Sequence, residues 1–182
     1  MSKALMIIDV QNDYFPGGKK ELVNAETAAK NAAELLNHAR KNGMKVIHVK
    51  HISEYPGASF FLPGTEGSEI HNSVKPLNDE KIIVKNFPNS FRSTDLDSYL
   101  YSNGIKEIVF CGMMSHMCVD SGVRAAKDYG YECVLVHDAC ATCDQVFGGE
   151  KIPAESVHRS FMAALNGTFA KIISTDDFKS NF

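Results

Sequence analysis

Short apolar runs alternate with helical periodicity along the chain, and this alternation limits the folds open to it. Strand-like runs occupy residues 4–8, 45–50, 81–85, 107–111, 132–136 and 170–173, and helical patterns occupy residues 24–42, 94–103, 118–129 and 153–165. Strands separated by helices require right-handed crossovers, which make the strands parallel and cover both faces of the sheet with helices. The sequence therefore predicts an α/β fold with a parallel sheet of six strands.

Composition narrows the classes of function. A chain of 182 residues is long enough for one core, so we expect a single domain over residues 1–182. Its 19 basic and 22 acidic residues give a net charge of −3 and form no basic block that could neutralise adjacent phosphates. The longest apolar run, residues 4–8, is far shorter than the roughly 20 residues of a membrane span. We expect no nucleic-acid or membrane binding, a cytoplasmic location, and free thiols because the 5 cysteines are odd in number.

Residues that can do chemistry stand where three of the predicted strands end. Asp9 follows the first strand, Lys85 ends the third, and Cys118 begins the helix after the fourth. Ligands of parallel sheets bind beyond the carboxyl ends of the strands, so these side chains can converge on one cleft if their strands are neighbours. Taken singly, each residue also has an ordinary structural explanation, since an aspartate can form a turn, a lysine can be solvated and a cysteine can pack in the core.

Together the three residue types make an acyl-transfer site. A thiol at a helix start meets unpaired N–H groups and the positive end of the helix dipole, which favour the thiolate, and a nearby lysine adds positive charge. An aspartate within hydrogen-bond reach can take the thiol proton and pass it to a leaving amine. We therefore interpret Asp9 as base and then acid, Lys85 as the electrostatic orienter, and Cys118 as the nucleophile. Backbone N–H groups of the turn and of Cys118 can face the developing oxyanion.

Four stretches carry a resemblance to a known family. They are residues 7–15 (IIDVQNDYF), 84–91 (VKNFPNSF), 112–121 (GMMSHMCVDS) and 136–142 (VHDACAT), and they resemble the signature stretches of the isochorismatase-like cysteine hydrolases. The resemblance implies a Rossmann-like, three-layer α/β/α sandwich, an Asp9–Lys85–Cys118 triad and an acyl-thioester intermediate. It also implies a cis peptide bond between Met113 and Met114, and an oxyanion hole formed by the N–H groups of Met114 and Cys118.

Departures from the family patterns favour one branch. Family nicotinamidases bind a metal through an Asp-x-His pair after the second strand, whereas residues 48–53 here read HVKHIS and leave His51 and His71 as isolated histidines. True isochorismatases cleave a vinyl ether and often lack the cysteine. The sequence is more similar to the metal-free, nicotinamidase-related amidases, so we expect cleavage of a C–N bond in a small amide, with no cofactor and no metal. Vinyl-ether hydrolysis, nicotinamide deamidation, and a non-catalytic thiol redox or binding role are the alternatives.

Substrate contacts are predicted by position alone. Gln11 and Phe15 follow the strand that ends before Asp9, and Phe91 follows Lys85. Phe60 lies in the long aperiodic segment of residues 52–80, and His116 precedes the nucleophile by two positions. We expect these five residues to contact the substrate. A loop as long as residues 52–80 inside a compact domain is usually functional. Because relatives are commonly homo-oligomers, the resemblance also implies a dimer or a larger assembly.

Overall fold

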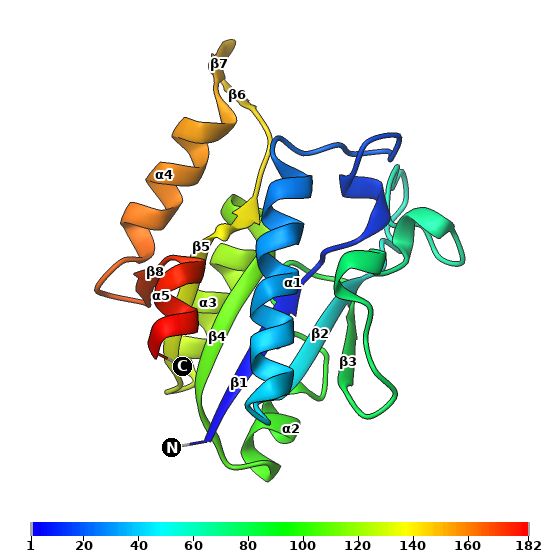
Figure 1. The fold of residues 1–182 in the computed structure, drawn as a ribbon. Coiled ribbons are helices and arrows are strands. Elements are labelled where there is room, and N and C mark those ends of the chain that lie inside the picture. The colour runs from blue at the N-terminus through cyan, green and yellow to red at the C-terminus, as the bar shows by residue number, and fades with distance from the viewer. Residues whose placement is uncertain (1, 182) are drawn as a thin grey trace.

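A computed structural model describes residues 2–181, and a six-stranded sheet forms its centre. Every pairing in this sheet is parallel, which confirms the predicted fold class. The strand order is β3-β2-β1-β4-β5-β8 (Figure 1). The strands are β1 (Ser2–Ile8), β2 (Lys45–His51), β3 (Lys81–Lys85), β4 (Ile105–Met113), β5 (Glu132–Ala141) and β8 (Lys171–Ile173).

Helices cover both faces of the sheet, as expected for parallel strands buried on two sides. Helices α1 (Ala25–Lys41) and α5 (Thr175–Asn181) share one apolar core with β1, β4 and β5. Helices α2 (Leu96–Ser102), α3 (Asp120–Asp128) and α4 (Ala154–Leu165) pack on the opposite face. The α1 sequence predicts its packing, because its buried residues form one stripe at helical spacing: Ala25, Ala28, Ala29, Ala32, Leu35, Leu36 and Ala39. Among residues 2–181, no helix is both long and apolar enough to cross a membrane.

Several elements differ from the prediction. The strand before the nucleophile extends to Met113, and a π-helical turn (Ser115–Val119) then leads into α3, so the helical segment begins three residues earlier than expected. A hairpin of β6 (Gln145–Phe147) and β7 (Glu150–Ile152) projects beyond the sheet (Figure 1), and neither it nor α5 was predicted. Strands of three residues and a helix of seven are too short to show a period.

Residues 52–80 form no strand and fold back over the carboxyl end of β1. Their only helical elements are 3₁₀ turns at Glu66–Ser68 and Asn72–Val74. Two backbone hydrogen bonds fasten the segment to the chain after β1, one from the N–H of Asn12 to the carbonyl of Glu69 and one from the N–H of His71 to the carbonyl of Val10. This long segment therefore covers the end of the sheet at which the predicted site residues lie.

Candidate active site

The sheet order brings Asp9, Lys85 and Cys118 together. Asp9 follows β1, Cys118 follows the adjacent strand β4, and Lys85 ends β3, two strands from β1 on the other side. The lysine reaches across the end of β2, where its Nζ lies 2.7 Å from Oδ2 of Asp9 and 3.2 Å from Sγ of Cys118. All three residues are buried. The structure thus places the three predicted catalytic side chains in mutual contact.

A close approach of two backbones sets this geometry. Ile8 pairs with Gly112 across β1 and β4, and a Cβ on Gly112 would lie 2.0 Å from the carbonyl oxygen of Ile8. The φ of Gly112 is +128°, which side-chain-bearing residues rarely adopt. Asp9 has a φ of 51°, in the left-handed region that Asp and Asn tolerate best among residues with side chains. The peptide bond between Met113 and Met114 is cis, at the position that the family resemblance implied.

The Lys85 ammonium has an acceptor for each of its three N–H donors. These acceptors are Asp9 Oδ2, Cys118 Sγ and, at 3.1 Å, Nδ1 of His51. Burial lowers the pKa of Lys85, but the charge of Asp9, the interaction with Cys118 and the hydrogen bonds to both raise it, and the net pKa is raised. The lysine is therefore a charged group held inside the protein by its three partners.

The surroundings of the Cys118 thiol oppose its ionisation, whereas the predicted helix start would favour the thiolate. Burial and then the charge of Asp9 raise the pKa of the Cys118 thiol far above its usual value, and Lys85 offsets only part of this effect. The cysteine is the fourth residue of the Ser115–Val119 turn, so it is farther from the start of the helical segment than predicted. Oδ1 of Asp9 is buried and has no hydrogen-bond partner among the described residues. A free carboxylate oxygen beside a protonated thiol is suited to take its proton.

The site contains ligand types that metals use, yet its charge opposes a metal ion. Ligand atoms of Asp9, His51 and Cys118 lie within 4.8 Å of one another, and zinc accepts all three donor types. However, the Lys85 ammonium donates to each of these side chains and so occupies the space between them. A divalent cation there would meet a full positive charge at contact distance. The arrangement thus favours chemistry by the thiol and the carboxylate alone.

Three aromatic side chains cover the triad. The ring of Tyr14 lies 4.6 Å from the ring of Phe61, and Phe60 lies 4.9 Å from Phe61, centroid to centroid. Burial, followed by interactions with Cys118 and Asp9, raises the pKa of Tyr14. Phe60 is half-buried in this cover, where it can contact a substrate. The sequence analysis found Phe60 but missed Tyr14, which no periodic pattern marks.

Asp13 fastens the cover, and its removal should loosen the fold. Its buried carboxylate accepts hydrogen bonds from the backbone N–H groups of Lys19 (3.1 Å) and Phe61 (2.7 Å). An Asp13→Ala variant leaves the Phe61 N–H buried without a partner, so we expect a loss of about 1–3 kcal/mol in the free energy of unfolding, measured by urea denaturation. Asp13→Asn keeps one acceptor oxygen and should lose less. Equal stability of wild type and Asp13→Ala would contradict this role.

The structure shows the protein partners of three residues that the sequence predicts to contact substrate. Gln11 is fully buried, and its amide bonds the main chain of His51 and Ser68. Phe15 stacks on His71 with centroids 3.8 Å apart, and it lines a groove against the outer side of α1. Phe91 is buried and stacks on Tyr129, the residue after α3, with centroids 4.9 Å apart. The substrate contacts of these three residues stay predictions.

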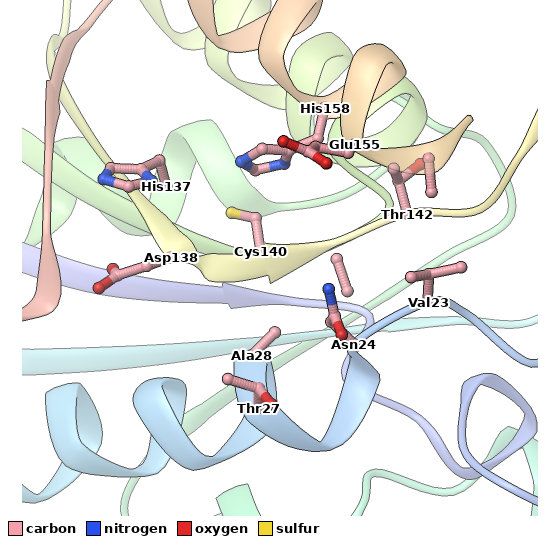
Figure 2. A pocket seen from close by; sticks show the side chains of 12 residues that line it. Val23, Asn24, Thr27, Ala28, His137, Asp138, Cys140, Thr142, Glu155 and His158 are labelled. Carbon is pink, nitrogen blue, oxygen red and sulfur yellow. The ribbon is translucent and has the colours of Figure 1, made fainter. Parts of the chain in front are cut away.

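A cavity of about 470 Å³ opens between the start of α1, the end of β5 and α4 (Figure 2). His137, Cys140 and Thr142 of the β5 segment face His158 of α4 across it. The cavity wall contacts the segment that carries the nucleophile. Oγ1 of Thr142 lies 2.5 Å from Nδ1 of His116, and Nδ1 of His158 lies 2.8 Å from the hydroxyl of Ser115. His116 is thus held at the side of the site, and its substrate contact stays a prediction.

Comparison with known proteins identifies the family. The Isochorismatase domain model matches residues 3–177. The chain belongs to the isochorismatase family.

This family member is 55% identical over 178 residues to the isochorismatase family protein YddQ of Bacillus subtilis, covering 98% of this chain and 99% of YddQ. It is 36% identical over 142 residues to a streptothricin hydrolase of Streptomyces noursei, covering 78% of this chain and 55% of that one. A crystal structure from Oleispira antarctica superimposes with a TM-score of 0.95 at 45% identity, covering 99% of this chain and 97% of the other. The protein is therefore an isochorismatase-family hydrolase with an Asp–Lys–Cys arrangement.

Proposed function

We propose that this isochorismatase-family hydrolase cleaves a C–N bond in a small amide through an acyl-thioester on Cys118. The observation that carries the proposal is the Lys85 ammonium, which bonds both the Asp9 carboxylate and Sγ of Cys118 in a buried site. It holds base and nucleophile side by side, while the second carboxylate oxygen of Asp9 is free to act. Only 6% of Cys118 is exposed, so the substrate must be small.

The geometry supports a two-step reaction. Asp9 takes the thiol proton as Sγ of Cys118 attacks the amide carbonyl, and the carbonyl electrons move to oxygen. Backbone N–H groups of Met114 and Cys118 are the proposed donors to this oxyanion. As the tetrahedral intermediate collapses, Asp9 gives its proton to the departing amine and a thioester remains. A water molecule then attacks the thioester, Asp9 accepts the proton of the water and returns a proton to sulfur, and the carboxylic acid leaves.

The names of relatives agree with hydrolysis of this bond type. A ureidoacrylate amidohydrolase of Variovorax paradoxus is 25% identical over an alignment of 212 positions, gaps included, that covers 98% of this chain and 81% of that one. The streptothricin hydrolase described above is likewise named for a hydrolytic reaction. Neither name identifies the substrate of this protein, but both favour an organic molecule of modest size.

A thiol redox role is the weaker candidate. Redox-sensing cysteines are exposed and have a low pKa, because the thiolate is the species that oxidants attack. Cys118 is buried, and burial raises the pKa of its thiol. Vinyl-ether hydrolysis does not require a nucleophilic thiol. A metal-dependent nicotinamidase reaction would require a metal ion to displace the Lys85 ammonium from Asp9, His51 and Cys118, the only group of possible metal ligands among residues 2–181.

The test is hydrolysis of a panel of small amides. Primary amides and carbamoyl compounds are followed by ammonia release, and lactams are followed by the mass of one added water. We expect turnover of at least one class, unchanged by EDTA because the site needs no metal, and reduced about 10³-fold or more in Cys118→Ala. Mass spectrometry of the quenched enzyme should show the acyl group on the peptide with Cys118. Full activity of Cys118→Ala, or loss with EDTA that zinc restores, would contradict the proposal.

A further inference from the structure

His51 completes the set of contacts that orients Lys85. An ammonium has three N–H donors, and each of them needs an acceptor when the group is buried. Asp9 and Cys118 supply two acceptors, and Nδ1 of His51 supplies the third at 3.1 Å. Sheet register explains this contact, because His51 at the end of β2 pairs directly with Lys85 at the end of β3.

Gln11 holds His51 in place from the other side. Its Oε1 accepts the N–H of His51 at 2.8 Å, and its Nε2 donates to the carbonyl of His51 at 2.8 Å. The same Nε2 donates to the carbonyl of Ser68 at 2.8 Å, in the segment that covers the site. The Gln11 amide is fully buried, so these bonds have no competition from water. Both the backbone and the ring of His51 are therefore fixed relative to the triad.

We propose that His51 is a positioning residue, which orients the Lys85 ammonium toward Asp9 and Cys118 and is itself held by Gln11. The inference rests on the proposed function and deepens it. The imidazole acts through the lysine and touches neither the nucleophile's proton nor the scissile bond. Without the Nδ1 acceptor, one N–H of Lys85 is buried without a partner, and the ammonium can satisfy that donor only by distorting its bonds to Asp9 and Cys118.

The electrostatics of His51 agree with an acceptor role. An imidazole can accept at Nδ1 only when it is neutral and carries its proton on Nε2. Burial, and then the charge of Lys85, lower the pKa of His51, while the charge of Asp9 opposes them without reversing the shift. The ring is therefore neutral near pH 7, and the lysine itself favours the form of the ring that accepts its hydrogen bond.

A matched pair of variants tests the role. Asn has an oxygen where His has Nδ1, so His51→Asn keeps an acceptor, whereas His51→Leu has a similar branched shape without one. We expect His51→Leu to lower kcat/KM about 10- to 100-fold, mainly in kcat, and to move the pH midpoint for alkylation of Cys118 by iodoacetamide upward. His51→Asn should recover both to within about threefold of wild type. His71→Leu is the control, because it changes a histidine that bonds Ser73 and stacks on Phe15 and is not one of the three acceptors of Lys85.

The two readouts separate the possible failures. Equal losses in His51→Leu and His51→Asn with an unshifted alkylation midpoint would show a packing role and overturn the proposal, as would wild-type behaviour of both variants. Alkylation needs no substrate. A shifted midpoint in His51→Leu alone, with no amide cleaved by any form, would therefore support the positioning role while refuting the proposed function. If His51→Leu does not fold, His51→Ala removes the same acceptor and is measured in its place.

Discussion

An Asp9→Asn variant should lose hydrolysis by about 10²- to 10⁴-fold and yet alkylate faster at Cys118 near pH 7. The loss follows because Oδ1 of Asp9 is the free, buried oxygen available to take the thiol proton, and an amide cannot take it. The faster alkylation follows because the charge of Asp9 raises the pKa of the Cys118 thiol while Lys85 lowers it. Removing the carboxylate charge leaves burial opposed by the lysine, so the pKa of the thiol falls and the thiolate fraction at neutral pH increases.

The opposite signs of these two effects make the experiment informative. Asn tolerates the left-handed backbone at position 9, where φ is 51°, and its side-chain oxygen can still accept from Lys85. The variant should therefore fold, which circular dichroism checks. Alkylation is measured against pH by mass spectrometry of the Cys118 peptide, with Cys118→Ala as the blank. A parallel fall of hydrolysis and alkylation would show instead that Asp9 is needed to form the thiolate, or that the site has collapsed.

The sequence predicts the triad because strand ends are a strong topological signal. Buried parallel strands have continuous apolar sequences, so a polar residue directly after one, such as Asp9, lies at the carboxyl edge of the sheet. The strand ending at Lys85 was predicted with the bounds that the structure has, residues 81–85. Asp9 and Lys85 are 76 positions apart in the chain, and the pattern of apolar strands predicts that both lie at the same edge of the sheet.

The remainder of the site depends on features that periodicity does not contain. His51 is one residue beyond the predicted strand of residues 45–50, and its contact with Lys85 requires knowing that β2 and β3 are neighbours in this register. Tyr14 and Phe61 meet over the triad only because the aperiodic segment of residues 52–80 folds back over β1. Gln11 was expected to contact substrate, and only its three-dimensional partners show that it bonds the main chain of His51.

The final prediction separates the stability of the triad from its function. Lys85→Met leaves the Asp9 carboxylate buried without its ion-pair partner, which costs about 3–5 kcal/mol of unfolding free energy in comparable buried pairs. Removing the second charge as well, in Asp9→Asn/Lys85→Met, should recover a measurable part of this loss, because no unpaired charge stays buried. Hydrolysis should be absent from both variants, since neither retains both the base and the ammonium.

The pH dependence gives this prediction a direction. In Lys85→Met, a proton neutralises the unpaired carboxylate of Asp9, so the native state binds this proton more tightly than the unfolded chain does. The free energy of unfolding of the variant therefore rises relative to that of wild type as pH falls from 7 toward 5. The double variant has no such carboxylate, and its difference from wild type should be flat over this range. Urea denaturation at several pH values measures both. A double variant as unstable as Lys85→Met, with no dependence on pH in either, would show that packing of the lysine stem, and not its charge, stabilises this end of the sheet.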